Sequence, residues 1–378
     1  MKKKICFVVA IPGTATAFLT DHISALSKDY SVYIAGNINS KDEIARLNVI
    51  DYYHVDIQRQ ITLVNDLKAV WQLWRYFRKM KFDAVHSVTP KAGLITALAG
   101  FLAGIKHRIH IYTGQVWATL HGGKRRLLMT IDRLIAKLDN HILIDGNSQR
   151  QFLIDNRIIS KDRSQVLASG SICGVNIERF TPTQECRDEK RKELRIKGDR
   201  TVFVFMGRLN RDKGLYELLS AFDQLAAERN DVYLLLFGND EEEVAATFGN
   251  YKNLKEHENF LYYGRTSSPQ TMMQAGDVLV LPTYREGFGS SVIEAACLGL
   301  STITSDAYGV LDASVPGVTG LQCKVGDVES LFIAMKELAK DKDKTHAMGQ
   351  RGRERVLKEF TGEIVVNAWM EYYHNMLG

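Results

Sequence analysis

The chain has 378 residues, of which 45% are hydrophobic and 25% charged, and its formal net charge is +5. This composition is typical of a folded globular protein and excludes a disordered chain, and the length predicts two domains. The five cysteines are scattered without a C-x-x-C pair, which argues against a disulfide framework or a zinc site and fits a reducing compartment.

The amino terminus is predicted to form a buried first strand. Residues 1–10 (MKKKICFVVA) have the cations of a signal peptide, but their apolar stretch is short and no small-residue cleavage site follows it. The longest nearly apolar run, residues 93–105, is well short of the roughly 20 residues that a membrane-spanning helix needs. We therefore expect no transmembrane segment.

Apolar strand-like runs alternate with amphipathic helical patterns along the chain. The strand candidates include residues 5–10, 31–35, 84–87, 109–113, 141–145, 201–206, 232–237, 278–282 and 301–304. Helical patterns lie between them, as at residues 18–27, 63–80, 91–102 and 215–228. Continuous apolar strands separated by helices are typical of parallel sheets covered on both faces. The pattern predicts an α/β protein with two doubly wound, Rossmann-like domains.

The polar and charged segment at residues 181–199 is predicted to be the linker between the domains. It separates a first domain, residues 1–180, from a second domain, residues 200–360. The tail, residues 361–378, has a helical pattern with Trp369 and two tyrosines, and we expect it to pack back on the first domain.

Charge is distributed unevenly between the halves of the chain. Residues 1–180 contain 25 Lys and Arg against 14 Asp and Glu, whereas residues 181–378 contain 24 against 30. A basic half indicates contact with something anionic, such as nucleic acid, a phosphorylated substrate or a membrane surface. Incidental surface charge is the alternative.

The first stretch that carries chemistry is the loop at residues 207–214 (GRLNRDKG), which follows a predicted strand and precedes a predicted helix. Ligands of open parallel sheets bind at the carboxyl ends of the strands. Arg208 can hold two phosphate oxygens, Lys213 supplies a point charge, and glycines such as Gly207 let the backbone approach an anion. The loop is suited to a diphosphate; a basic surface turn is the alternative.

The second stretch, residues 282–295 (PTYREGFGSSVIEA), also follows a predicted strand. Ser290 or Ser291 would begin a helix whose free N–H groups attract an anion. Glu294 lies about one turn into this helix and can accept hydrogen bonds from vicinal hydroxyls, and Glu286 precedes it in the loop. Carboxylates beside anion-binding groups suggest a ligand with both phosphates and hydroxyls, such as a nucleotide sugar; a helix with an acidic first turn is the plainer interpretation.

These motifs together resemble the retaining glycosyltransferases of family 4, which have the GT-B fold. The resemblance rests on Gly207-Arg208-x4-Lys213-Gly214 followed by Glu286-x7-Glu294. Supporting matches are residues 170–180 (GSICGVNIERF), Gly264 after Leu261-Tyr262-Tyr263, residues 275–282 (AGDVLVLP) and residues 84–94 (AVHSVTPKAGL). The last stretch is similar to the bacterial surface-polysaccharide enzymes. The resemblance implies two Rossmann-like domains that face each other across a cleft, with the acceptor on the first domain and the donor on the second.

The resemblance also implies roles for single residues. Arg208 and Lys213 would neutralise the diphosphate leaving group, Glu294 would hold the ribose, and Glu286 would lie beside the donor sugar. The remaining donor contacts would be the backbone amides of residues 287–291 (Gly287, Phe288, Gly289, Ser290 and Ser291), Gly264 and Arg265 near the base, and the loop of Gly13 in the first domain.

The sequence departs from the family pattern at two places. The family often has a histidine in a Thr-x-His context of the first domain, and here Gln115 occupies that place after Thr113. Gln115 is therefore a candidate first-domain contact in place of the histidine. Asn176 stands at the domain junction where aspartate is usual.

No metal or other cofactor is expected. The Asp-x-Asp pattern at residues 341–343 lies in a charged run far from any strand end, and we interpret it as a solvated helix terminus. Arg208, Lys213 and a helix N-terminus supply positive charge for the leaving group without an ion. No clustered His or Cys pattern suggests a metal site.

Two basic stretches of the first half contain large apolar residues. The first, residues 71–82 (WQLWRYFRKMKF), contains Trp71, Trp74, Arg75 and Arg78, and the second, residues 124–129, begins with Lys124, Arg125 and Arg126. Such surfaces suit an anionic bilayer or a lipid-linked acceptor. The alternative for the first stretch is an ordinary helix with its aromatic side chains in the core.

The sequence therefore predicts a cytoplasmic enzyme, peripheral on the inner face of the membrane, that transfers a sugar from a UDP-sugar to a saccharide acceptor. We expect a lipid-linked acceptor in bacterial O-antigen or capsule biosynthesis, and no nucleic acid partner. Two alternatives remain: a nucleotide-sugar epimerase of the same architecture, and a non-catalytic subunit that binds a nucleotide sugar. A dehydrogenase is disfavoured because no G-x-G-x-x-G follows the first strand.

Overall fold

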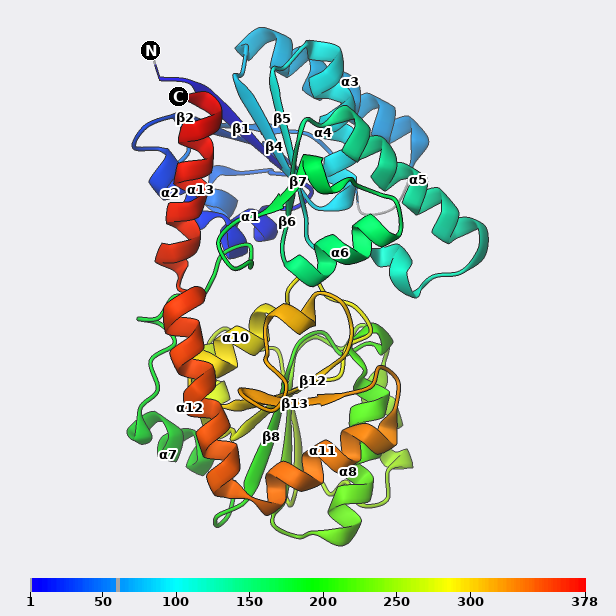
Figure 1. Ribbon diagram of the computed structural model, residues 1–378, viewed down its shortest axis with the longest axis vertical. Coiled ribbons are helices and arrows are strands. Elements are labelled where there is room, and N and C mark those ends of the chain that lie inside the picture. Colours follow the sequence, from blue (N-terminus) through cyan, green and yellow to red (C-terminus); the bar gives the residue numbers. More distant parts are fainter. Residues whose placement is uncertain (1, 59–61) are drawn as a thin grey trace. The chain divides into compact units, whose positions relative to one another are not determined.

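The structure is a computed structural model that describes residues 2–58 and 62–378. The chain divides into two compact units: unit 1 comprises Met1–Cys173 and Gly362–Gly378, and unit 2 comprises Gly174–Thr361. Each unit contains one parallel sheet with helices on both faces (Figure 1). The prediction of two doubly wound α/β domains is confirmed.

Unit 1 has a seven-stranded sheet in the order β3-β2-β1-β4-β5-β6-β7, with every neighbouring pair parallel. Its strands are β1 (Lys4–Val9), β2 (Ser31–Gly36), β3 (Asp51–His54), β4 (Ala84–Val88), β5 (His107–Tyr112), β6 (His141–Ile144) and β7 (Ser164–Val166). Its helices are α1 (Pro12–Phe18), α2 (Thr20–Leu26), α3 (Leu63–Met80), α4 (Pro90–Ala103), α5 (Gly122–Leu138), α6 (Asn147–Asp155) and α13 (Gly362–Leu377).

The central strand β1 shows why the sheet of unit 1 is covered on both sides. Alternate side chains of a strand point to opposite faces. Ile5 and Phe7 pack in a cluster that includes residues of α2 and α13, whereas Cys6 and Val8 pack in a cluster with residues of α3 and α4. All four are fully buried, which accounts for the continuous apolar run in the sequence.

Helix α13 brings the carboxyl terminus of the chain into the core of unit 1. Trp369 is 1% exposed, and its ring stacks on His22 (centroids 4.2 Å apart) and on His86 (4.9 Å). The Tyr373 hydroxyl lies 2.7 Å from Nδ1 of His86. Burial lowers the pKa of His22 to about 4 and that of His86 well below its usual value, so both rings are neutral at pH 7.

Unit 2 has a six-stranded parallel sheet in the order β10-β9-β8-β11-β12-β13. Its strands are β8 (Thr201–Met206), β9 (Val232–Phe237), β10 (Phe260–Gly264), β11 (Val278–Leu281), β12 (Ser301–Ser305) and β13 (Gly320–Cys323). Its helices are α7 (Gln184–Glu193), α8 (Leu215–Glu228), α9 (Pro269–Met272), α10 (Ser290–Cys297), α11 (Val328–Lys340) and α12 (Lys342–Glu359).

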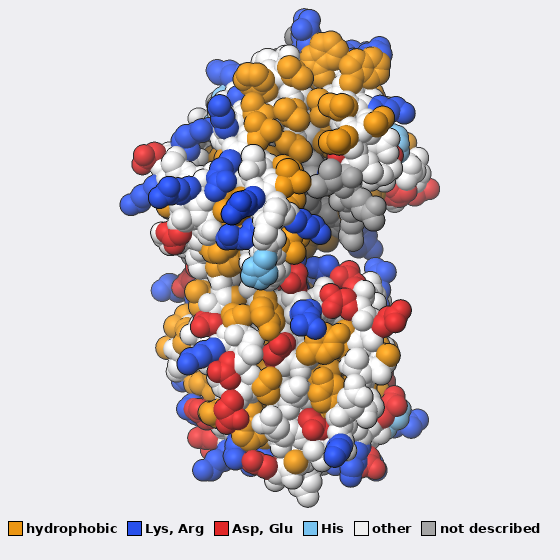
Figure 2. All heavy atoms as spheres, turned by 90° about the vertical axis from the view of Figure 1, so that its right-hand side faces the viewer, with side chains coloured by type: hydrophobic (Ala, Val, Ile, Leu, Met, Phe, Trp, Pro, Cys, Tyr) orange, Lys and Arg blue, Asp and Glu red, His pale blue; other side chains and the backbone are white. Residues whose placement is uncertain are grey.

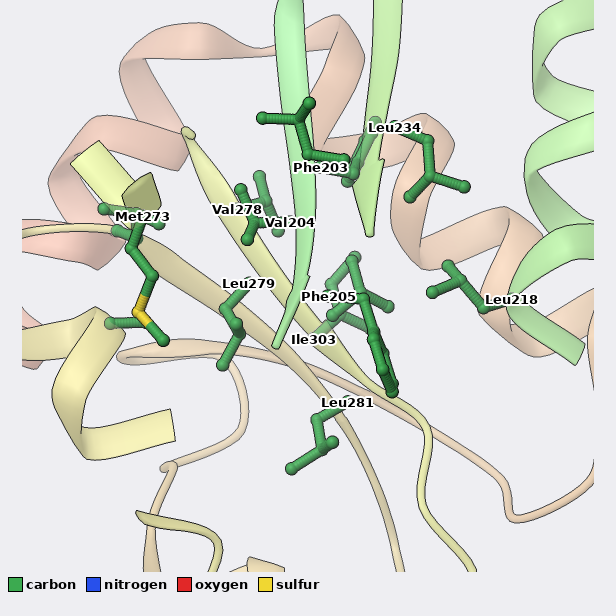
Figure 3. Packing of buried hydrophobic residues seen from close by; sticks show 14 of the residues in the cluster. Phe203, Val204, Phe205, Leu218, Leu234, Met273, Val278, Leu279, Leu281 and Ile303 are labelled. Carbon is green, nitrogen blue, oxygen red and sulfur yellow. The ribbon is translucent and has the colours of Figure 1, made fainter. Parts of the chain in front are cut away.

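The core of unit 2 is centred on strands β8 and β11. Phe203, Val204 and Phe205 of β8 are fully buried, as is Leu279 of β11. Figure 3 shows these side chains between helix α8 on one side and the segment of Met273 on the other. Each such side chain contributes about 1.5–3 kcal/mol by leaving water, so this core holds rigid the strand ends from which the loops of the candidate site emerge.

The boundary between the units differs from the sequence prediction. The segment 181–199 was expected to be a linker, but the structure places it within unit 2, whose first residue is Gly174. Helix α7 lies in this segment, and its Arg187 and Arg191 form ion pairs with Asp277 at 2.5 and 2.7 Å. The segment resembles a linker in composition because ion pairs and hydrogen bonds, rather than a continuous apolar face, hold α7 in place.

No helix in the described parts of the chain combines the length and the apolar character needed to cross a bilayer.

Candidate active site

The candidate site of unit 2 lies at the carboxyl ends of β8 and β11. These neighbouring strands mark the point where the strand order of the sheet reverses, because β9 and β10 follow on one side and β12 and β13 on the other. Crevices at such a reversal are the usual ligand sites of open parallel sheets. The two loops that the sequence singled out, residues 207–214 and 282–289, both begin at this point.

The two loops are joined to each other by backbone and side-chain contacts. The Asp212 carbonyl accepts hydrogen bonds from the Thr283 hydroxyl (2.9 Å) and from the backbone N–H of Tyr284 (2.8 Å). The Asp212 carboxylate accepts from Nε and Nη2 of Arg285, at 2.9 and 2.5 Å. Gly214 has a φ of +70°, and a Cβ there would lie 1.9 Å from the carbonyl oxygen of Pro282, so only glycine permits this approach.

Lys213 and Glu286 form an ion pair across the two loops. Their side chains are only 18% and 13% exposed. The structure therefore brings two of the three predicted catalytic residues into direct contact, and each neutralises the charge of the other.

Arg208, the third predicted catalytic residue, pairs with a residue that the sequence analysis did not single out. Nη1 of Arg208 lies 2.8 Å from Oε2 of Glu241. The same carboxylate oxygen accepts from Nδ2 of Asn210 at 3.1 Å. Glu241 follows β9, the neighbour of β8, so sheet order brings it to Arg208. It lies in the acidic run at residues 240–243. Its place just beyond the strand next to β8 is the signal in the sequence that could have identified it.

The loop after β11 ends at the N-terminus of α10. Gly289 is the N-cap, with a φ of +89°, and no side chain caps the helix. Among the described residues no acceptor is recorded for the backbone N–H groups of Ser290 and Ser291. The first turn contains no acidic residue, so these groups and the helix dipole can bind an anion.

Two further residues define the shape of this loop. A Cβ at Gly309, which has a φ of +85°, would lie 2.2 Å from the backbone oxygen of Glu286, so the loop after β12 supports the backbone of Glu286 and Gly287. Gly309 is not among the residues that the sequence motifs singled out. Phe288, a predicted donor contact, has its side chain in the core (2% exposed), where it packs edge-on against Phe360. Only the backbone of Phe288 is left for a ligand.

Glu294 occupies the fifth position of α10. Burial raises the pKa of its carboxyl to about 7, and the positive charge of Arg179 partly opposes that rise. No hydrogen-bond donor to this carboxylate is recorded within residues 2–58 and 62–378. A partly buried acceptor without a donor is suited to a ligand that brings hydroxyl groups. Nearby, Asn176 accepts from the backbone N–H of Arg179 at 2.9 Å, as an aspartate there would.

The other predicted donor contacts of unit 2 lie at the same edge of the sheet. Gly207 directly follows β8 and donates its N–H to the Phe237 carbonyl (3.0 Å). Gly264 is the last residue of β10, and the space where a Cβ would lie is open. Arg265 follows it and is exposed. All of these residues therefore lie at the carboxyl-terminal edge of the sheet, where the two loops also begin.

The predicted contacts of unit 1 have different surroundings. Gly13 is exposed in the first turn of α1, directly beyond β1, rather than in an open loop. Gln115 is buried (1% exposed) after β5, and its Oε1 accepts a hydrogen bond from Nε2 of Gln149 (3.2 Å). The Gln115 side chain is thus part of a buried polar contact rather than an exposed group.

The acidic pattern at residues 341–343 belongs to a helix terminus, as the sequence suggested. Asp341 is the N-cap of α12, and its carboxylate accepts from the backbone N–H of Lys344 at 2.9 Å. No group of three or more His, Cys, Asp or Glu side chains with the arrangement of a metal site occurs in the described residues.

A cavity of about 440 Å³ lies at the opposite edge of the same sheet. It is lined by residues at the amino-terminal ends of the strands, such as Thr201 and Asp277, and by Lys342 and His346. Three of its charged residues, Arg187, Asp277 and Lys342, have ion-pair partners. The loops described above lie at the other ends of the strands, so this cavity is separate from the candidate site.

The chain matches two family models in consecutive stretches. Residues 15–170 match "Glycosyl transferase 4-like domain" and residues 186–355 match "Glycosyl transferases group 1". It is 29% identical over 323 residues to the capsular polysaccharide biosynthesis glycosyltransferase CapM of Staphylococcus aureus, covering 85% of this chain and 84% of CapM. It is 25% identical to the Escherichia coli UDP-Gal:alpha-D-GlcNAc-diphosphoundecaprenol alpha-1,3-galactosyltransferase, covering 80% and 78% of the two chains.

A solved structure supports the same fold. The structure of Anabaena Alr3699/HepE in complex with UDP and glucose superposes with a TM-score of 0.80 at 16% identity, over 99% of this chain and all of that one. Three findings agree on the family of the chain. They are the matches to both family models, the similarity to capsule and polysaccharide enzymes, and the two Rossmann-like sheets. The chain therefore belongs to the GT-B-type glycosyltransferases of family 4.

Proposed function

We propose that this glycosyltransferase moves a hexose or N-acetylhexosamine from a UDP-sugar to a lipid-linked saccharide, with retention of the anomeric configuration, in bacterial O-antigen or capsule biosynthesis. The observation that carries the proposal is the convergence of the Arg208–Lys213 loop, the Glu286 loop and the N-terminus of α10 at the strand reversal of unit 2. The reaction would take place on the cytoplasmic side of the membrane.

The donor would bind to unit 2 through groups of opposite character. The diphosphate would be bound by Arg208, Lys213 and the backbone N–H groups of Ser290 and Ser291. Each of these groups carries a full or partial positive charge and can donate hydrogen bonds to phosphate oxygens. Glu294, which lacks a recorded donor among the described residues, would accept hydrogen bonds from the ribose hydroxyls. Gly264 and Arg265 lie at the same edge and would border the base.

The Lys213–Glu286 ion pair suggests how binding prepares the site. A diphosphate competes with Glu286 for Lys213, since both are anions. When Lys213 turns to the phosphates, the Glu286 carboxylate is released and can accept hydrogen bonds from the donor sugar. The paired state therefore keeps both groups in place, at little net charge, until the donor arrives.

In the transfer step, the bond between the anomeric carbon and the diphosphate breaks and the acceptor hydroxyl attacks from the same face. The leaving diphosphate would take the proton of that hydroxyl. Arg208, Lys213 and the amides at α10 stabilise the negative charge that develops on the diphosphate, as preorganised donors do in other enzymes. These groups are the reason that we propose transfer without a metal ion.

Two similar proteins support the choice of substrates. The name of the Escherichia coli relative states a UDP-Gal donor and a diphosphoundecaprenol-linked acceptor, and the Anabaena structure was solved with UDP and glucose. We propose a UDP-sugar donor and a lipid-linked acceptor for this chain as well, because its own donor-site residues have the chemistry that such a donor requires.

The test measures sugar transfer with a panel of UDP-sugars and lipid-linked acceptors. Arg208→Ala and Lys213→Ala should each lower kcat/KM roughly a hundredfold, because each substitution removes about 3 kcal/mol of transition-state stabilisation. Arg211→Ala is the matched control in the same loop. The guanidinium carbon of Arg211 lies 5.4 Å from the centroid of the Tyr216 ring, so this side chain does not face a carboxylate. Turnover close to normal in both site variants would remove the diphosphate assignment.

Three further readouts separate the alternatives. Turnover that EDTA leaves unchanged would support transfer without a metal, and turnover that EDTA abolishes would contradict it. Binding of UDP without transfer to any acceptor or slow UDP release from a UDP-sugar would indicate a non-catalytic subunit. The configuration of the product at the anomeric carbon, measured by NMR, decides between retention and inversion.

A further inference from the structure

Helices α3, α4 and α5 form one layer on the sheet of unit 1. The inner side of this layer is apolar and buried, with Leu73 and Phe77 of α3 packing in the cluster that also holds Ile95 of α4. Figure 2 shows hydrophobic side chains gathered on the outer surface of this part of unit 1, with Lys and Arg around them.

The exposed apolar residues are numerous for a helix layer that faces water. On α3, Leu63 (76% exposed), Leu67 (69%) and Trp71 (52%) are spaced four residues apart and form one stripe. On α4 and α5, Phe101, Leu102 and Leu127 are exposed as well. An ordinary surface helix has a polar outer face, so α3 has a second apolar face beyond the one that it buries.

The charges on this layer are almost all positive. The three helices contain ten Lys and Arg but only two Asp. Asp66 pairs with Lys91 at 2.8 Å, and Asp132 is buried and accepts from Nε1 of Trp117 at 2.7 Å. The exposed cations are Lys68, Arg75, Arg78, Lys79, Lys124, Arg126, Arg133 and Lys137; none of them has an ion pair with a described carboxylate.

The aromatic residues of α3 combine both characters. The guanidinium of Arg75 lies 4.7 Å from the centroid of the Trp71 ring, and that of Arg78 lies 5.9 Å from Trp74. Trp71 is exposed, whereas Trp74 is partly buried against the core. The sequence allowed either an aromatic and basic surface or an ordinary helix with its aromatic side chains in the core, and α3 has both features. One side of α3 packs in the core, and the other side is an exposed aromatic and basic surface.

We propose that the outer face of α3, α4 and α5 docks on an anionic lipid bilayer. Anionic lipid headgroups would be the partners of the cations that have no ion pair. The hydrocarbon below the headgroups would accommodate the aliphatic and aromatic side chains. Nucleic acid matches the cations but offers no hydrocarbon to the leucines. The proposal deepens the proposed function, because it names the partner surface on which a lipid-linked acceptor would be met.

The test uses the full chain and vesicles without donor or acceptor, so it is independent of sugar transfer. The protein should sediment with phosphatidylglycerol-containing vesicles at low salt, bind pure phosphatidylcholine vesicles much more weakly, and dissociate as salt is added. Trp71 is the only exposed tryptophan in the described chain, so binding should shift its fluorescence to the blue, and brominated lipids should quench it.

Matched variants identify the face. Leu67→Ser with Trp71→Ser should weaken binding at least tenfold, and Arg75→Glu with Arg126→Glu should do so by about fivefold or more for each cation. Ile333→Ser (53% exposed) and Lys252→Glu, both on unit 2, should leave binding unchanged. Thermal melting verifies that all variants fold.

Three results would overturn the proposal: no binding to the anionic vesicles at low salt, equal loss in the unit 2 variants, or binding that does not depend on lipid charge. Stronger retention on nucleic acid than on vesicles, lost in the same unit 1 variants, would assign the face to nucleic acid instead. Transfer to a water-soluble acceptor remains measurable in every case, so the proposed function stands or fails separately.

Discussion

Glu294 illustrates how burial changes the chemistry of a single residue. Its carboxyl has a pKa raised by burial to about 7, so the folded protein binds a proton there between about pH 4.5 and 7, where the unfolded chain has released it. Stability therefore falls as pH rises through this range, by at most about 3 kcal/mol. The ionised carboxylate above pH 7 is held at a cost that a hydroxyl-bearing ligand would offset.

Glu294→Gln should remove this pH dependence. Relative to the wild type, the variant should gain stability between pH 5 and pH 8, as measured by thermal melting at both values. UDP binding should release a proton near pH 6 to 7 in the wild type, because ribose hydroxyls favour the ionised carboxylate, and release less in the variant. Calorimetry in buffers of different ionisation enthalpy measures this; equal proton release in both proteins would contradict the ribose contact.

At the scale of elements, the candidate site is assembled by loops from neighbouring strands. The loop after β9 contributes Glu241 to Arg208, the loop after β11 contributes Glu286 to Lys213, and the loop after β12 supports Glu286 through Gly309. Each contact depends on which strand lies beside which. The charges of the site are thus balanced between elements rather than within one loop.

Glu241→Gln should strengthen UDP binding. The carboxylate competes with a diphosphate for Arg208, and an exposed pair of this kind is worth about 0.2–1 kcal/mol, so the dissociation constant should fall up to about fivefold. Glu242→Gln is the matched control, because its carboxylate accepts from the backbone N–H of Arg211 (3.0 Å) rather than from Arg208. Weaker UDP binding in Glu241→Gln would show that Glu241 positions Arg208 for the ligand instead of competing with it.

Elements differ in how well the sequence predicted them. The central strands β1, β4, β8, β9 and β11 are buried on both faces, so their apolar runs were clear. The strands β3, β7, β10 and β13 were not among the strand candidates, because each is short, contains partly exposed residues and lies at or near a sheet edge. Helix α7 was assigned to a linker because its charged residues bind Asp277 instead of packing in the core.

At the scale of the whole molecule, the last helix of the chain, α13, belongs to the first unit. Unit 1 is discontinuous in sequence, because α13 follows the whole of unit 2 along the chain. Its Trp369 and Tyr373 pack against β1, β4 and α2 through aromatic contacts with Phe7, His22 and His86. The stability of unit 1 therefore depends on residues more than two hundred positions away.

Trp369→Ala should destabilise unit 1 by about 3–5 kcal/mol, because it leaves a large cavity among buried rings. Hydrogen exchange followed by mass spectrometry should show faster exchange in β1 and β4, with β8 and β11 of unit 2 unchanged. Trp71→Ala, at an exposed position of the same unit, is the control and should have little effect. Equal loss of protection in both units would mean that the two units do not unfold separately.

The local sequence determined the doubly wound fold class and the loops that bear the candidate site, since buried strands and the glycine-rich, charged segments after them are recognisable within a few residues. Only the tertiary structure decided that Glu241 meets Arg208, that Phe288 lies in the core, that Gln115 is buried and that unit 2 begins at Gly174. These facts depend on strand order and on packing between distant segments, and the pattern of residues along one segment contains no information about its neighbours in space.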